Sequence, residues 1–329
     1  MRDIPIASAQ FQHADGNKPH NLDRIAALAK TAADHAAEIV CFHECSITGY
    51  THLQHLNHAQ MLDLAEPLDG PSIKRLNTIA RETNLVVMAG LVEKDHENRC
   101  YNSYVAVDGS GTILLHHRKL NDFISPHITN GNQFTVAEIR GVHIGCLTCY
   151  DNNLPENVRI TTLLGAEVIV MPHVTGCTPS TMPGRGPVDR ALWENRKQDP
   201  VRLRQEFQGP KGRAWLLKWL PARAWENGIH AVFSNPIGLD GGTVKPGLAM
   251  VVDPNGEILV ESTALGDDVV VGLLTANAYN QASGRRYLAA RRPELYAKLV
   301  EPHPPGHQAI TKPGWALAFE APTQRQKGE

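Results

Sequence analysis

GVHIGCLTCYDNNLPENVR, residues 141–159, joins an apolar run to a tight polar turn and then to a helix start. Residues 141–148 are typical of a buried strand, and residues 152–155 are predicted to form the turn. Pro155 and Glu156 suit a first helical turn, where proline loses no needed hydrogen bond and an acid favours the helix dipole. Cys149 therefore lies where a strand ends and a helix is about to begin. Backbone N–H groups point outward at such a place, and we expect them to stabilise a thiolate.

The rest of the chain alternates between apolar runs of two kinds. Apolar residues at helical spacing predict helices over 21–37, 71–83 and 157–164, the first with Asn21 as its N-cap. Short apolar runs predict strands over 4–12, 38–42, 85–92, 166–171 and 228–233. The segments 101–107 with 112–117 and 248–253 with 257–262 are predicted to form hairpins. This alternation indicates a layered α/β protein with mixed sheets.

No break resembling a linker occurs before residue 276, so we expect one domain over residues 1–275. Within it, residues 174–223 carry ten basic and four acidic side chains with three interleaved tryptophans. Such an excursion is typical of solvated surface helices, or of a lid or wall over the site that binds an anionic group or a partner subunit. The tail, residues 276–329, is predicted to be a helix followed by a proline-rich segment that packs on the domain or on a partner subunit.

The bulk composition excludes several classes of protein. The 329 residues carry a formal net charge of −2, which argues against nucleic-acid binding and against an anionic membrane surface. No apolar run approaches the roughly 18 residues that span a membrane. The N-terminus looks like a first strand rather than a signal peptide. Six scattered cysteines without an export signal are expected to be thiols in the cytoplasm rather than a disulfide framework.

Three strand ends carry groups that suit nucleophilic catalysis. Glu44 follows the strand EIVCF, Lys119 follows ILLHH, and Cys149 follows GVHIGCLT. A nucleophilic cysteine needs a base and donors for the oxyanion that it creates. We expect the strands to share one edge, so that a buried Glu44 acts as the base and Lys119 stabilises the oxyanion. The backbone N–H of Tyr150 is predicted to be a second oxyanion donor.

The motifs FHECSITGY, HHRKLN and CLTCYDNNLPE, in this order, resemble the Glu, Lys and Cys motifs of the nitrilase, or carbon–nitrogen hydrolase, superfamily. ARAWENGIHAVFSNPIG and DPNGEIL resemble two further segments of the family. The resemblance implies a four-layer α-β-β-α sandwich and a homodimer or higher homo-oligomer with helices packed across subunits. It implies Glu44 as general base, Lys119 as oxyanion stabiliser and Cys149 as nucleophile, with no cofactor and no metal. The expected reaction is attack on a small linear carboxamide or N-carbamoyl compound, loss of ammonia and hydrolysis of a thioester.

The sequence departs from the family pattern in two places near these motifs. His43 stands where the family often has proline before the glutamate. A second glutamate between the Lys and Cys motifs is also missing, because Glu138 lies in strand-like sequence and is poorly placed. Asp122 or His127 is the candidate to replace it. As further pocket or supporting residues the sequence offers Tyr50, Asn153, His173 and Glu226.

Several alternatives remain open at this stage. Tyr150-Asp151 after the cysteine resembles the amidase-like branches, and nitrile hydrolysis is the alternative activity. Acyl transfer to an amine, or a non-catalytic protein of the same fold, is also compatible with the motifs. Cys146 and Cys149 form a C-x-x-C pair, but Cys146 lies within an apolar strand, which favours a packing role over a redox or zinc pair.

Overall fold

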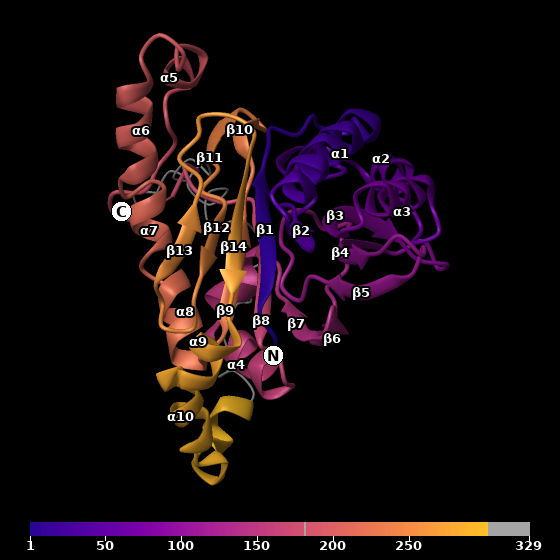
Figure 1. Cartoon of the computed structure of the whole chain (residues 1–329). Helices are drawn as coiled ribbons and strands as arrows, with labels where there is room; N and C mark the ends of the chain where they lie inside the picture. The colour runs from indigo at the N-terminus through magenta and orange to yellow at the C-terminus, as the bar shows by residue number, and fades with distance from the viewer. Residues whose placement is uncertain (181, 302–329) are drawn as a thin grey trace, which may run out of the picture.

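Two six-stranded sheets pack face to face at the centre of the molecule (Figure 1). The computed structural model describes residues 1–180 and 182–301. The first sheet has the order β14 (Asp268–Leu274), β1 (Ile4–Gln10), β2 (Ile39–Cys41), β3 (Val86–Lys94), β4 (Cys100–Val107) and β5 (Ile113–Arg118). The second has the order β6 (Thr135–Ile139), β7 (Val142–Cys146), β8 (Val168–Pro172), β9 (His230–Ser234), β12 (Met250–Val252) and β13 (Ile258–Glu261).

Both sheets are mixed, and they share one pairing pattern. In these orders each sheet has an antiparallel pair, then two parallel pairs, then two antiparallel pairs. The inner faces meet in an apolar core that includes Ile6, Val86, Ile144 and Val168. Burying a side chain of this size contributes about 1.5–3 kcal/mol, which explains the run of branched residues in both sheets.

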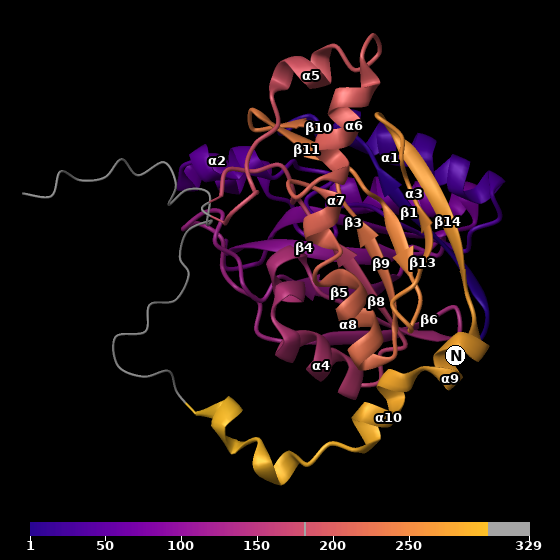
Figure 2. The ribbon, with the colours of Figure 1, turned by 90° about the vertical axis from the view of Figure 1, so that its left-hand side faces the viewer.

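Helices cover the two outer faces. α1 (Lys18–Asp34) and α3 (Pro71–Thr83) pack on the first sheet, whereas α4 (Pro155–Leu163) and α8 (Leu220–Asn227) pack on the second. Figure 1 and Figure 2 show these helices on opposite sides of the paired sheets. The molecule is therefore a four-layer α-β-β-α sandwich, and the predicted fold is confirmed.

Most predicted elements occur within a few residues of their expected bounds. The helix over 71–83 is correct because Pro71 starts it and Asn84 ends it in the left-handed conformation at φ 56°. The prediction that Asn21 caps the first helix is wrong. Asn17 is the N-cap, accepting from the N–H of His20, and α1 begins at Lys18. The amide of Asn21 instead binds Ala14 and Ile47 in the helix–sheet interface. The sequence prediction also missed β14.

The excursion over residues 174–223 projects from one end of the sandwich (Figure 1). It contains α5 (Arg190–Glu194), α6 (Pro200–Gln208) and α7 (Arg213–Leu216). Its apolar side chains form a small core against the hairpin of β10 (Ile237–Asp240) and β11 (Thr243–Pro246). The excursion is therefore more than a set of solvated helices, since it has a core of its own.

Short elements complete the described chain. They are η1 (Thr51–His55), α2 (His58–Leu64), η2 (Cys149–Asn153), α9 (Ala276–Gln281), α10 (Ser283–Ala289), η3 (Pro293–Leu295) and η4 (Ala297–Val300). α10 packs on α8, where the rings of Trp225 and Tyr287 meet edge to face at 5.3 Å. The proline-rich segment expected in the tail lies almost wholly outside the described residues. Among the described helices, none has the length and apolar character that crossing a membrane requires.

Candidate active site

The three strand ends meet at one end of the sandwich, but they come from both sheets. Glu44 follows β2 and Lys119 follows β5 of the first sheet, whereas Cys149 follows β7 of the second. The expectation that one sheet edge carries all three is therefore wrong. The stacking of the two sheets, rather than the pairing of their strands, brings the acid and the cysteine together.

Glu44 and Lys119 form a fully buried ion pair. Lys119 Nζ donates to Glu44 Oε1 at 2.7 Å, and neither side chain is exposed to solvent. Asn102 Nδ2 donates to the same oxygen at 2.7 Å, and the N–H of Val174 donates to Oε2 at 3.1 Å. A buried charge is costly unless it is paired and hydrogen-bonded, and both conditions hold here.

Asp122 joins this group from the side of Lys119. Its carboxylate accepts from Asn102 Nδ2 at 2.9 Å and lies 3.6 Å from Lys119 Nζ, with its side chain fully buried. His127, the other candidate for the missing acid, packs against the ring of His58 at 5.5 Å instead. Glu138 is exposed on β6. Of the acids between the Lys and Cys motifs, the structure thus brings Asp122 to Glu44 and Lys119.

The backbone around Cys149 is fixed in a strained conformation. Cys149 has φ 52°, a left-handed conformation that non-glycine residues adopt at a cost of about 1–3 kcal/mol. Asn152 Nδ2 donates to the carbonyls of Leu147 at 2.7 Å and of Cys149 at 3.3 Å. Arg223 of α8 donates to the carbonyl of Asn152 at 3.1 Å. These contacts hold the turn from both of its ends.

Asp151 ties the cysteine turn to the lysine segment. Its carboxylate accepts from the N–H groups of Leu120 at 3.0 Å and Asn121 at 2.8 Å. Because Asp151 lies two residues after Cys149, and Leu120 follows Lys119, one buried side chain sets the spacing between the thiol and the ammonium group.

The three groups differ in how the site changes their pKa. Burial raises the pKa of the Cys149 thiol above its usual range; the charge of Glu44 raises it further, and that of Lys119 lowers it. Burial raises the pKa of Glu44 more than Lys119 lowers it. Burial alone would lower the pKa of Lys119, but the charges around it, that of Glu44 first, together raise that pKa. The raised pKa of Cys149 runs against the expected stabilised thiolate and favours the neutral thiol.

Aromatic side chains surround the ammonium group. Lys119 Nζ lies 5.2 Å from the ring centres of Tyr50 and of Phe123, and it donates to the Tyr50 hydroxyl at 3.4 Å. The ring of Tyr150 meets Phe123 edge to face at 5.2 Å. Such rings shield the ion pair from water and stabilise the cation.

His173, expected to line the pocket or to cap its strand, is buried at the end of β8. Its Nε2 lies 3.2 Å from the amide of Asn152, and its ring stacks on Trp219 at 5.3 Å. Burial and then the charge of Lys119 hold the pKa of His173 well below its usual value, so the imidazole is neutral.

Asn153 and Glu226 lie farther from the ion pair. Asn153 contributes its carbonyl, which accepts from Arg223 at 3.1 Å, and Glu226 pairs with Arg223 at 2.9 Å. Both act on the site through Arg223 and the end of the cysteine turn.

The sequence did not reveal that Asn102 donates to Glu44 or that Asp151 binds the segment after Lys119. Asn102 is a buried amide in β4, and buried polar groups require partners. That polar residue was the available signal. Cys146 lies in the core between the sheets, as its apolar strand predicted.

Comparisons with known proteins identify the family and several relatives of this chain. The carbon–nitrogen hydrolase family model matches residues 5–282. An (R)-stereoselective amidase from Pseudomonas sp. is 32% identical over 93% of this chain and 98% of its own. A citrullinase from Francisella tularensis is 26% identical over 91% of this chain and 99% of its own.

A solved amidase of the same fold adds a structural comparison. The amidase from Nesterenkonia sp. AN1, in a structure with covalent addition of the acetamide moiety of fluoroacetamide at its active-site cysteine, superposes with a TM-score of 0.66. It is 23% identical, and the match covers 90% of this chain and 97% of that one. The chain belongs to the carbon–nitrogen hydrolase family, and it is a hydrolase of carbon–nitrogen bonds other than peptide bonds. The predicted family and enzyme class are confirmed.

Proposed function

We propose that the protein hydrolyses a small linear carboxamide through a thioester on Cys149 and releases ammonia. The observation that carries the proposal is the buried Glu44–Lys119 pair beside a neutral cysteine thiol. The amidase from Pseudomonas sp. supports a carboxamide substrate. The citrullinase relative supports a second candidate, an N-carbamoyl compound, since both substrates present a terminal CO–NH₂ group.

In the first half of the reaction, Glu44 accepts the thiol proton as the sulfur of Cys149 attacks the carbonyl carbon. The oxyanion forms against Lys119 and the N–H of Tyr150. When the tetrahedral intermediate collapses, the C–N bond breaks and Glu44 returns the proton to the leaving nitrogen, which departs as ammonia. The acyl group remains on Cys149 as a thioester.

In the second half, water replaces ammonia. Glu44 takes a proton from the water as its oxygen attacks the thioester carbon, and the C–S bond breaks. The proton returns to the sulfur, and a carboxylic acid leaves. An N-carbamoyl substrate follows the same steps and yields a carbamic acid, which loses carbon dioxide.

The raised pKa of Glu44 fits this double role. A base and acid works best when its pKa is near the working pH, and burial moves Glu44 in that direction. Asp122 keeps Lys119 charged and, through Asn102, holds Glu44 in place. In this proposal Asp122 replaces the second glutamate of the family as a positioning group.

The test is ammonia release from a panel of amides, ureides and nitriles with wild type, Cys149→Ala and Glu44→Gln. We expect the amides to react fastest and both variants to lose at least about 10³-fold in rate. Activity that survives in Cys149→Ala would overturn the mechanism. Preference for a nitrile would replace the proposed substrate class, and hydroxamate formation with added hydroxylamine would reveal acyl transfer.

We also propose that the enzyme is a cytoplasmic homo-oligomer. All six cysteines are unpaired and buried, as befits a reducing compartment. Apolar side chains on the outer layer are exposed, and they include Ile160 and Leu163 of α4, Leu164 directly after it, and Trp225 of α8. A second copy of the chain would cover them. Leu163→Glu should lower the mass measured by light scattering, whereas Leu259→Glu on β13 should not.

A further inference from the structure

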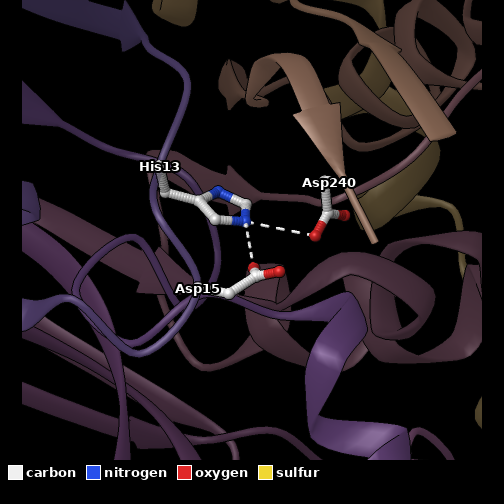
Figure 3. Close-up of side chains that lie close together, drawn as sticks. All are labelled: His13, Asp15 and Asp240. Carbon is white, nitrogen blue, oxygen red and sulfur yellow. Dashed lines mark hydrogen bonds and ion pairs between the residues drawn. The ribbon is translucent and has the colours of Figure 1, made fainter. Parts of the chain in front are cut away.

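A second group of titratable side chains includes the residue that precedes Glu44, and Figure 3 shows three of its other members, His13, Asp15 and Asp240. His43 directly precedes Glu44, and its Nε2 lies 3.1 Å from His13 Nδ1. His13 Nε2 in turn lies 3.1 Å from Oδ1 of Asp240, at the end of β10. The side chains of His43, His13 and Asp240 are almost completely buried. The chain of contacts joins three segments that are far apart in the sequence.

Asp240 also binds Thr51, the residue after Tyr50. Its two carboxylate oxygens accept from the N–H of Thr51 at 3.1 Å and from the hydroxyl of Thr51 at 2.6 Å. Thr51 follows Tyr50, whose hydroxyl accepts from Lys119. The carboxylate of Asp240 is thus linked through His13 to His43, the neighbour of Glu44. It is also linked through Thr51 to Tyr50, whose hydroxyl contacts Lys119.

His13, Asp15 and Asp240 offer three atoms close enough to surround a cation. The charges present argue for another role. Lys245 Nζ lies 3.7 Å from Asp240 Oδ2, and both oxygens of Asp240 already accept from Thr51. Burial lowers the pKa of His13, but hydrogen bonds to Asp15 and Asp240 outweigh it and raise the pKa to about 9. At neutral pH the charge of His13 therefore lies between the two carboxylates, where a metal would otherwise supply it.

A protonated His13 satisfies both of its neighbours at once. It donates from Nε2 to Asp240 and from Nδ1 to His43, and His43 accepts through Nε2 as a neutral imidazole. Burial and then the charge of His13 keep the pKa of His43 well below its usual value. When His13 loses its proton, one N–H remains for two acceptors. The contact to His43 then breaks, or His43 must change its tautomer.

We propose that His43, His13 and Asp240 are positioning residues that fix Glu44 for catalysis only while His13 is protonated. The inference rests on the role proposed for Glu44. The charged and titratable groups that face His13 are Asp240 and His43 across its two nitrogens and Asp15 at 3.6 Å. Behind them stand Lys245 next to Asp240 and His52, 3.4 Å from Asp15. Because this positioning depends on the proton of His13, we expect the reaction rate to fall at alkaline pH.

The experiment compares kcat and KM across pH for wild type, His13→Gln and Asp15→Asn. In wild type, kcat should fall as the pH rises through about 9, because His13 loses its proton there. The pKa values of Cys149 and Lys119 are raised, so the loss of a proton from either group should not cause a descending limb of the pH–activity profile at this pH. In His13→Gln, kcat at pH 7 should fall about 10²-fold with KM nearly unchanged, and the limb near pH 9 should disappear.

Asp15→Asn gives a change that a purely structural role would not produce. The Asp15 side chain is 40% exposed, and its contact with His13 raises the pKa of that histidine, so its loss should move the fall in activity at alkaline pH to lower pH. This variant stays informative if His13→Gln does not fold. His127→Gln is the matched control, because that histidine packs on His58 and should leave the limb in place.

A limb near pH 9 that persists in His13→Gln, or a limb that does not move in Asp15→Asn, would overturn the proposal. Failure of the proposed function looks different, since wild type would then release no ammonia from any substrate. In that case the rate at which iodoacetamide alkylates Cys149 at pH 7 reports on the base directly. A lower rate in His13→Gln than in wild type supports positioning, and equal rates contradict it.

Discussion

Glu44 and Cys149 face the same reaction centre, but the protein fixes them by different means. Glu44 is held through its side chain by Lys119, Asn102 and the N–H of Val174, in a buried group of charges. Cys149 is held through its backbone: its φ is positive, its carbonyl accepts from Asn152, and the carbonyl of Asn152 in turn accepts from Arg223. The base is set by electrostatics and the nucleophile by geometry.

This difference predicts how each half of the site fails. A substitution on the base side should change stability and the pH dependence together, because it alters buried charge. A substitution on the cysteine side should lower the rate and leave the pH dependence in place.

Lys119→Met should be the most damaging change on the base side. It leaves Glu44 and Asp122 as buried carboxylates without their cation, which costs about 3–5 kcal/mol of unfolding free energy. The oxyanion also loses a donor, so kcat/KM should fall at least about 10³-fold. Urea unfolding and steady-state kinetics measure the two effects.

The control for this change is Lys298→Met, since Lys298 forms an exposed pair with Glu301 near the end of the described chain. Exposed pairs contribute little, so both measurements should stay close to wild type. A stable and active Lys119→Met variant would show that the base side does not depend on buried charge.

Asp151→Ala should mainly damage geometry. The N–H groups of Leu120 and Asn121 lose their acceptor, at a cost of about 1–3 kcal/mol in unfolding free energy. The spacing of Lys119 and Cys149 then relaxes, and kcat should fall about 10²-fold. The pH at the midpoint of the acid limb should stay where it is in wild type. A shift of that midpoint would contradict the contrast.

The sequence was informative for whatever depends on local pattern. Apolar runs located β2, β5 and β7, and each catalytic candidate lies within three residues of the end of one of them. The sequence did not reveal that two sheets supply them, since sheet stacking depends on contacts between distant segments.

Local pattern failed where long-range contacts decide. The turn after β7 predicted a stabilised thiolate, but burial and the charge of Glu44, 105 positions earlier in the chain, raise the pKa of Cys149. Asn21 was predicted as a cap from its position alone, whereas the fold uses its amide to bind Ile47. The link from His13 to Asp240 spans 227 positions, and no spacing rule reports such a contact.

Asp122→Asn should move the acid limb of the pH profile. Activity requires an unprotonated Glu44, so it is lost as the pH falls through the pKa of Glu44. The charge of Asp122 raises that pKa, so its removal should shift the limb to lower pH. We expect kcat at neutral pH to fall less than about tenfold, since the oxygen of the introduced amide can still accept from Asn102. Glu138→Gln on the exposed face of β6 is the control, and a limb that moves to higher pH would contradict the charge argument.

Cys146→Ala should have the smallest effect, and it separates the two cysteines of the C-x-x-C pair. Cys146 packs between the sheets with Ile144, Val168 and Val170, so losing its sulfur leaves a small cavity that costs about 1 kcal/mol. Its thiol has no part in the proposed chemistry, and kcat/KM should stay within about twofold of wild type. Cys149→Ala is the matched contrast, because it should keep the stability and lose the activity. Complete loss of activity in Cys146→Ala would mean that the two thiols act together, and the nucleophile would then depend on more than the geometry of its turn.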